Sequence, residues 1–155
     1  MTVKTGIVAT ASKSLFRREC AVTAEIAASP ETIWKLLTAA DDMVRWNSTL
    51  TSMAGTIGPG GTVRMEVPEA PGQVFEIEVT TFTPPSEMVW TQGNPIFFRG
   101  VRTYRLTPQP GGTTRFEMIE VFSGLALPMA ASRLPDFKPI FERYAADLKA
   151  EAESA

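Results

Sequence analysis

Apolar and polar residues alternate early in the chain, at the spacing of a β-strand. Val22, Ala24 and Ile26 fall on one side of this segment, which predicts a first strand with a core-facing side. The string Ser29-Pro30-Glu31 follows, with a capping hydroxyl, a proline suited to the first helical position and an acid in the first turn. We therefore expect a helix that begins at this proline, and a second short helical turn that ends around Trp46.

Beyond Trp46 the helical period disappears and turns rich in glycine and proline recur at short intervals. Between the turns apolar residues alternate again, as in Phe75, Ile77 and Val79, so each strand has one apolar and one polar side. The pattern predicts an antiparallel meander of strands, with turns at Gly58–Gly61, Ala70–Gly72, Pro84–Pro85 and Gly111–Gly112.

The last hairpin of the meander has the clearest pattern. Its strands are expected at about 97–107 and 113–122, with Tyr104 opposite Phe116. The parity that turns these aromatic residues inward also turns Arg102 and Glu120 inward, on diagonal cross-strand positions. The two charged side chains should therefore reach each other.

After Gly124 the apolar period returns to that of a helix. We expect a short helical piece, a kink at the prolines that follow, and a long amphipathic helix from about Asp136 to Ala152. Its apolar stripe, turned toward the sheet, consists of Phe137, Phe141, Tyr144 and Leu148.

Charge and composition exclude several classes of function. The 155 residues include 15 Lys and Arg against 17 Asp and Glu, without a block of like charge, so nucleic acid is not an expected partner. The chain has no histidine and one cysteine, Cys20, which removes the familiar zinc sites and the Ser-His-Asp and Cys-His triads. We expect no metal and no cofactor, and Cys20 suits a small buried hydrophobe.

The domain organisation expected from the sequence is simple. Residues 1–17 are rich in Thr, Ala, Lys and Ser without periodicity, and we interpret them as a flexible arm before a single domain at 18–155. The N-terminal apolar stretch is too short for a secretory signal and no run is long enough to span a membrane. These features favour a cytoplasmic protein, and a homodimer is possible.

One strand, two short helices, six more strands and a long C-terminal helix are the order of the helix-grip fold, an α+β fold in which a seven-stranded curved antiparallel sheet wraps around the last helix. Several short strings resemble the polyketide cyclase and dehydrase branch of the SRPBCC (START-like) superfamily over about residues 18–152. They are Ala28-Ser29-Pro30-Glu31-Thr32-Ile33-Trp34, Met88-Val89-Trp90, Phe98-Arg99-Gly100, Tyr104-Arg105-Leu106-Thr107-Pro108 and Glu120-Val121-Phe122-Ser123-Gly124-Leu125.

The resemblance implies an apolar cavity between the sheet and the last helix that holds a lipid, a hormone-like molecule or an aromatic polyketide. We expect a few hundred cubic ångströms, bounded by Trp90, Tyr104, Phe116, Met118 and Phe141. The full set of candidate ligand-binding residues is Trp46, Met65, Phe75, Trp90, Phe98, Arg102, Tyr104, Phe116, Met118, Glu120, Phe137 and Phe141. The aromatic members of this set could equally fill an ordinary core.

Arg102 departs from this branch, whose members often carry a histidine at that position, so a mechanism based on the imidazole cannot be transferred. Arg102 and Glu120 could form a structural ion pair, or they could orient a carbonyl or carboxylate of a ligand. No catalytic residue is assigned, because a cationic neighbour works against Glu120 as a base.

Three functions remain open from the sequence. The first is a binder or carrier of a hydrophobic small molecule, favoured by the cavity-forming fold and the missing imidazole. The second is a cyclase or dehydratase that acts on a ligand in the same cavity. The third is a protein-interaction module like the chaperone co-activators of the superfamily, which needs an exposed apolar patch.

Overall fold

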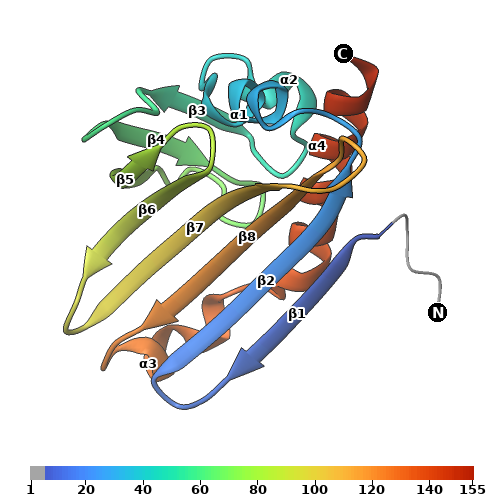
Figure 1. Cartoon of the computed structure of the whole chain (residues 1–155). Helices are drawn as coiled ribbons and strands as arrows, with labels where there is room; N and C mark the ends of the chain where they lie inside the picture. The colour runs from blue at the N-terminus through green and yellow to red at the C-terminus, as the bar shows by residue number, and fades with distance from the viewer. Residues whose placement is uncertain (1–5) are drawn as a thin grey trace.

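A curved antiparallel sheet wraps around the C-terminal helix in the computed structural model, which describes residues 6–155 (Figure 1). The sheet has eight strands in the order β1-β2-β8-β7-β6-β5-β4-β3, and every neighbouring pair is antiparallel. The strands are β1 (Val8–Lys13), β2 (Arg17–Ile26), β3 (Ser52–Gly55), β4 (Thr62–Glu66), β5 (Phe75–Thr83), β6 (Glu87–Asn94), β7 (Phe98–Pro108) and β8 (Thr114–Ser123). This is the expected α+β architecture, with a START-like curved sheet and a closing helix.

The strand count corrects the sequence analysis, which expected seven. The additional strand, β1, lies within the segment interpreted as a flexible arm and pairs along its whole length with β2. This strand was not predicted because it lies at the edge of the sheet and its residues are nearly all exposed, so its sequence shows no apolar alternation. The first residues of the expected arm, 1–5, lie outside the described residues.

The helices begin where the sequence predicted. Helix α1 (Pro30–Thr38) is capped by the Ser29 hydroxyl, which accepts a hydrogen bond from the Thr32 amide at 3.2 Å. The short helix α2 (Met43–Trp46) follows it. After β8 come α3 (Leu127–Ala130), the 3₁₀ turn η1 (Ala131–Arg133) and the long helix α4 (Phe137–Ser154), whose cap is Asp136.

The β7–β8 register differs from the prediction by two residues. Tyr104 pairs with Met118 rather than Phe116, and Arg102 lies directly opposite Glu120 rather than diagonally. The connection begins one residue later than expected, because the Gln109 amide donates to the Thr113 carbonyl at 2.8 Å and leaves the preceding proline in the strand. A shift of two residues preserves the parity of the strand, so the residues predicted to face inward still do so.

The core lies between the concave face of the sheet and α4. Phe141, Tyr144 and Leu148 of this helix are fully covered, as predicted for its apolar stripe. The end of α4 is also fastened to β2 and the loop after it. Lys149 Nζ donates to the Glu25 carbonyl and Glu153 accepts from the Ala27 amide, both at 2.8 Å. The C-terminal half of α4 is thus held on the sheet.

Gly124 provides a test of how β8 connects to α3. The residue has φ of +130°, and a Cβ there would overlap the carbonyl group of Phe97 on the neighbouring turn. We expect Gly124→Ala to lower the free energy of unfolding by about 3 kcal/mol or more, because backbone strain and steric overlap add. Urea unfolding measures this change.

The matched control is Gly111→Ala, which has φ of +89° but open space around the added methyl group. It should cost only about 1 to 2 kcal/mol, the price of the backbone conformation alone. Equal losses in the two variants would show that the contact with Phe97 is unimportant.

Candidate functional site

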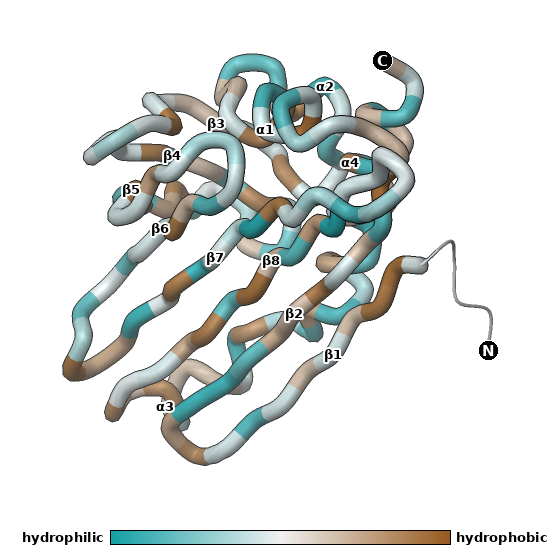
Figure 2. The backbone as a smooth tube through the Cα atoms, viewed as in Figure 1, coloured by the Kyte–Doolittle hydropathy of each residue, from teal (hydrophilic) through white to brown (hydrophobic). Residues whose placement is uncertain are grey.

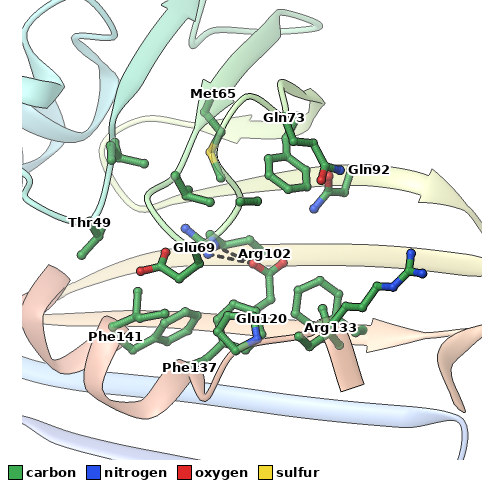
Figure 3. A pocket seen from close by; sticks show the side chains of 18 of the residues that line it. Thr49, Met65, Glu69, Gln73, Gln92, Arg102, Glu120, Arg133, Phe137 and Phe141 are labelled. Atoms are coloured by element: carbon green, nitrogen blue, oxygen red, sulfur yellow. Dashed lines mark hydrogen bonds and ion pairs between the residues drawn. The ribbon is translucent and has the colours of Figure 1, made fainter. Parts of the chain in front are cut away.

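A cavity of about 310 Å³ lies between the concave sheet, the first half of α4 and the β4–β5 connection (Figure 3). Of its 21 lining residues, 13 are apolar and 8 are polar or charged. The lining residues are Thr49, Leu50, Met65, Val67, Glu69, Ala70, Gln73, Phe75, Gln92, Phe98, Arg102, Glu120, Phe122, Ala130, Arg133, Leu134, Pro135, Phe137, Ile140, Phe141 and Tyr144.

Aromatic rings build one side of this wall. Phe122 of β8 stacks on Phe137 at the start of α4, with ring centroids 5.3 Å apart, and also packs against Phe98 of β7 at 5.7 Å. Phe137 meets Phe141 one helical turn later, edge to face at 5.9 Å. This row of rings gives a ligand a large apolar surface with few rotatable bonds.

Seven of the twelve candidate residues lie around the cavity, and they come from β4, β5, β7, β8 and α4. They are Met65, Phe75, Phe98, Arg102, Glu120, Phe137 and Phe141. The five that lie outside its lining, all of them buried, are Trp46, Trp90, Tyr104, Phe116 and Met118.

Of the five residues expected to bound the cavity, Phe141 belongs to its lining, and Trp90 lines a much smaller space of about 10 Å³ beside Arg102 and Glu120. The second half of α4 rests directly on the sheet, and Tyr144 stacks on Phe116 with nearly parallel rings, 6.2 Å apart. Trp90 packs against Tyr104 at 5.0 Å in the same layer. Inward-facing residues beneath this half of the helix fill the core, and the cavity of about 310 Å³ lies under the first half.

The sequence analysis also missed several lining residues. Phe122 and Tyr144 could have been found, because the first shares the parity of Glu120 and the second belongs to the predicted helical stripe. The segments 67–73 and 130–135 could not, because connections carry no period that reveals which way a side chain points.

The polar centre of the cavity is the ion pair of Arg102 and Glu120, drawn with dashed lines in Figure 3. The guanidinium donates from Nε and Nη2 to the same carboxylate oxygen, Oε1, each at 2.8 Å. The side chains are only 13% and 7% exposed, so water screens the pair weakly. Arg102 also lies over the Phe141 ring, 5.2 Å from its centroid, in a cation–π contact.

Two tyrosines extend this polar centre into the core. Arg102 Nη1 donates a long hydrogen bond, 3.5 Å, to the Tyr104 hydroxyl. The Tyr144 hydroxyl lies close to that of Tyr104, yet it makes no well-formed hydrogen bond with any described residue although it is completely buried. Tyr144 is one of the lining residues of the cavity, but its hydroxyl oxygen is itself covered by neighbouring side chains.

Burial and charge keep these groups in defined protonation states. Burial raises the pKa of both phenols above 10.0, and Arg102 only partly offsets this for Tyr104. Burial has the largest single effect on the pKa of Arg102 and opposes its charge, but Glu120 together with Tyr104 and Tyr144 outweighs burial, so the pKa of the guanidinium is raised. The centre thus contains a neutral pair of phenols and an ion pair without net charge.

Neither metal chemistry nor a reactive thiol is supported by the described residues. Within residues 6–155 no group of three or more His, Cys, Asp and Glu side chains is placed to hold a metal ion. Burial, with help from Asp136, raises the pKa of the Cys20 thiol to about 11, so the thiolate nucleophile is scarce at neutral pH. None of the described helices has the length and apolarity to span a bilayer.

Comparison with known proteins places the fold. A family model described as polyketide cyclase / dehydrase and lipid transport matches residues 17–153. No curated protein matches the sequence significantly.

Among solved structures, a START superfamily protein from Mycobacterium smegmatis aligns with a TM-score of 0.64 and 19% identity, over 88% of this chain and 97% of that one. The di-domain ARO/CYC StfQ of the steffimycin biosynthetic pathway aligns with a TM-score of 0.68 and 12% identity, over 90% of this chain and 51% of that one. A Thalictrum norcoclaurine synthase point mutant, in complex with a transition state analogue, aligns with a TM-score of 0.66 and 11% identity, over 92% of this chain and 98% of that one. At these identities the likeness shows the fold alone.

A double-mutant cycle measures the ion pair. We expect Arg102→Ala and Glu120→Ala each to lower the free energy of unfolding by about 3 to 5 kcal/mol, because each leaves the partner charge buried and unpaired. The double variant should lose less than the sum of the two by about 2 kcal/mol or more. Urea unfolding of the four proteins gives the coupling.

The exposed cross-strand pair Arg64 and Glu76 is the matched control, with N···O at 3.7 Å and side chains 58% and 71% exposed. Its coupling should lie within roughly 0 to 1 kcal/mol. Similar coupling in the two pairs would mean that the cavity pair is solvated.

Tyrosine absorbance reports on the same centre, because Tyr104 and Tyr144 are the only 2 tyrosines in the chain. Their raised pKa values predict no phenolate signal from the native protein near pH 10.0, whereas the urea-unfolded chain should titrate there. Since the folded-state pKa values exceed the unfolded ones, stability is intact below pH 10.0 and falls as the pH rises further. A native titration that overlays the unfolded one would contradict this burial.

Proposed function

Because the chain belongs to the polyketide cyclase / dehydrase and lipid transport family, we propose that it binds or carries one neutral hydrophobic small molecule, lipid-like or aromatic and polyketide-like, in the cavity under α4. The observation that carries the proposal is an aromatic wall around a buried polar centre, the Arg102–Glu120 pair, beside which the Tyr144 hydroxyl makes no well-formed hydrogen bond with the described residues. Binding pockets typically combine an apolar lining with a few placed polar groups.

The charge of the polar centre supports a neutral ligand. Glu120 already neutralises Arg102, so a carboxylate placed there would add an uncompensated charge to a poorly solvated site. A carbonyl or hydroxyl group carries no such penalty. It can accept a hydrogen bond from the Tyr144 hydroxyl, while the second oxygen of Glu120, for which the described residues show no hydrogen bond, can accept one from a ligand hydroxyl.

The size of the cavity narrows the ligand further. Its volume of about 310 Å³ is at the small end of the range for ligand sites, roughly 300 to 1,000 Å³. This favours a single ring system or a single short chain over a lipid with two long chains. The polar group of such a ligand would lie against Arg102, Glu120 and Tyr144, and its apolar part against the phenylalanine row.

A cyclase or dehydratase reaction in the same cavity is the second candidate function. The same Tyr144 hydroxyl favours it, because a phenol kept neutral by burial can donate a hydrogen bond to a substrate carbonyl and polarise it. No residue is assigned as a base. Carriage ranks first because it needs only binding.

The expected cytoplasmic location and a possible homodimer stay predictions.

Tyr144→Phe tests the proposed role of the hydroxyl. We expect the variant to be as stable as the parent protein or more so, since it removes a buried hydroxyl that makes no well-formed hydrogen bond, and such a group typically costs about 1 to 3 kcal/mol. Its affinity for a naphthyl ketone dye such as Prodan should fall roughly fivefold to tenfold. Binding of diphenylhexatriene, which has no polar group, should not change. Fluorescence titration gives both affinities, and native mass spectrometry of freshly purified protein looks for a bound molecule.

A bulky residue in the lining tests the location of binding. Ala70→Trp, on the β4–β5 connection, should abolish saturable binding of both dyes by filling the cavity, whereas Ala54→Trp on exposed β3 should not. If Ala70→Trp binds both dyes normally, the ligand site is elsewhere. If neither dye binds the parent protein and no molecule copurifies, the proposal of a carrier fails.

A further inference from the structure

One end of the molecule exposes a group of large apolar side chains, which we call the apolar end. Six of the nine large hydrophobic residues found exposed among residues 6–155 belong to it: Leu15, Phe16, Ile96, Phe97, Leu125 and Met129. They lie on the β1–β2 turn, the β6–β7 turn and the β8–α3 connection with α3, which meet at the lower edge of the sheet in Figure 2. Met129 is 83% exposed, which is unusual for so large an apolar residue.

Backbone hydrogen bonds join the three turns into one surface. The Gly124 amide donates to the Phe16 carbonyl at 3.2 Å, the Leu125 amide to Ile96 at 3.0 Å and the Ala126 amide to Phe97 at 2.7 Å. The strands that enter and leave these turns, β2, β8 and β7, are neighbours in the sheet. The apolar side chains are thus held side by side, and a contiguous exposed patch of this kind marks an interaction site.

Basic residues surround the apolar end. Lys13 and Arg18 face each other across β1 and β2, directly beside the turn. Arg17 and Arg99 flank Ser123 on the two neighbouring strands, and Arg133 follows α3. Two acids lie among them: Glu19 pairs with Arg17 at 2.6 Å, and Asp136 lines the same surface hollow as Lys13 and Arg18. The remaining cations give this end a positive character in a chain whose net charge is -2.

We propose that the apolar end docks on the surface of a membrane containing anionic lipids, with the three turns inserted among the headgroups. Apolar side chains surrounded by Lys and Arg are the combination that binds such an interface: the apolar groups enter the headgroup region and the cations are attracted to the negative surface. Insertion is shallow and reversible. A protein partner would have to match the same apolar and positive surface, whereas anionic lipid matches it without any special shape.

One segment links the wall of the cavity to this surface. Helix α3 carries exposed Met129, and four of the residues that follow it, Ala130, Arg133, Leu134 and Pro135, belong to the cavity wall. Docking at the apolar end would therefore bring a segment of the cavity wall close to the lipid. Docking itself does not depend on the proposed ligand, because the side chains that insert are not those that line the cavity.

Cosedimentation of the full chain with vesicles tests the proposal. The protein should sediment with mixed phosphatidylcholine–phosphatidylserine vesicles at low salt, and less with pure phosphatidylcholine or at high salt. The double variant Leu125→Ser/Met129→Ser should bind at least about tenfold more weakly, because two exposed apolar groups no longer insert. Lys13→Gln and Arg99→Gln should each weaken binding to the anionic vesicles roughly fivefold, and binding to the neutral ones little.

The matched control is Val44→Ser, which removes an exposed apolar side chain on α2, away from the three turns, and should bind vesicles like the parent protein. Circular dichroism and dye binding in lipid-free solution check each variant, so loss of docking is separated from loss of the cavity. The proposal is overturned if the parent protein does not sediment with anionic vesicles, or if the double variant sediments equally well. It is also overturned if the parent is a dimer that the double variant converts to a monomer, since the apolar end would then bind a second copy of the chain.

Discussion

Two opposite charges that are almost out of contact with water constrain how the central strands β7 and β8 pair. Arg102 and Glu120 can remain charged there only because they face each other directly on β7 and β8, and because Phe141 covers the guanidinium. A slip of one residue between the two strands would turn one of the charges to the convex side and leave the other buried alone. The cost of burying either charge alone thus favours a single alignment of the two central strands, and the position of the cavity follows from that alignment.

The closing helix divides the concave face into two regions with different roles. Where Tyr144 and Leu148 lie on the sheet, side chains such as Phe116 and Met118 are completely covered and act only as core. Nearer the start of the helix, the phenylalanine row and the β4–β5 connection enclose open space. The inward-facing residues of the two regions are of similar apolar and aromatic types. Whether such a residue fills the core or lines the cavity therefore depends on how closely the helix approaches the sheet.

This division explains what could be predicted from the sequence. Periodicity and capping residues were sufficient for α1, the sheet's antiparallel order and α4, because these signals are local. They predicted that Arg102 and Glu120 meet, since parity survives an error of two residues in register. Edge strand β1 was missed because exposure removes its pattern. Phe116 was expected at the cavity but lies in the core, because the distance of a residue from the helix leaves no trace in the sequence.

The two connections that close the cavity have a kinetic consequence. In 67–73 the backbone bonds of Ala70 and Gln73 go to Val67 and Ala70, and the Leu134 amide of the other connection bonds to Ala131, so these contacts stay within single turns. Such segments can open while the β-ladders and α4 remain intact, at a free energy well below that of global unfolding. A ligand bound as proposed would therefore exchange by local fluctuations, and its residence time would be set by these turns rather than by the stability of the whole fold.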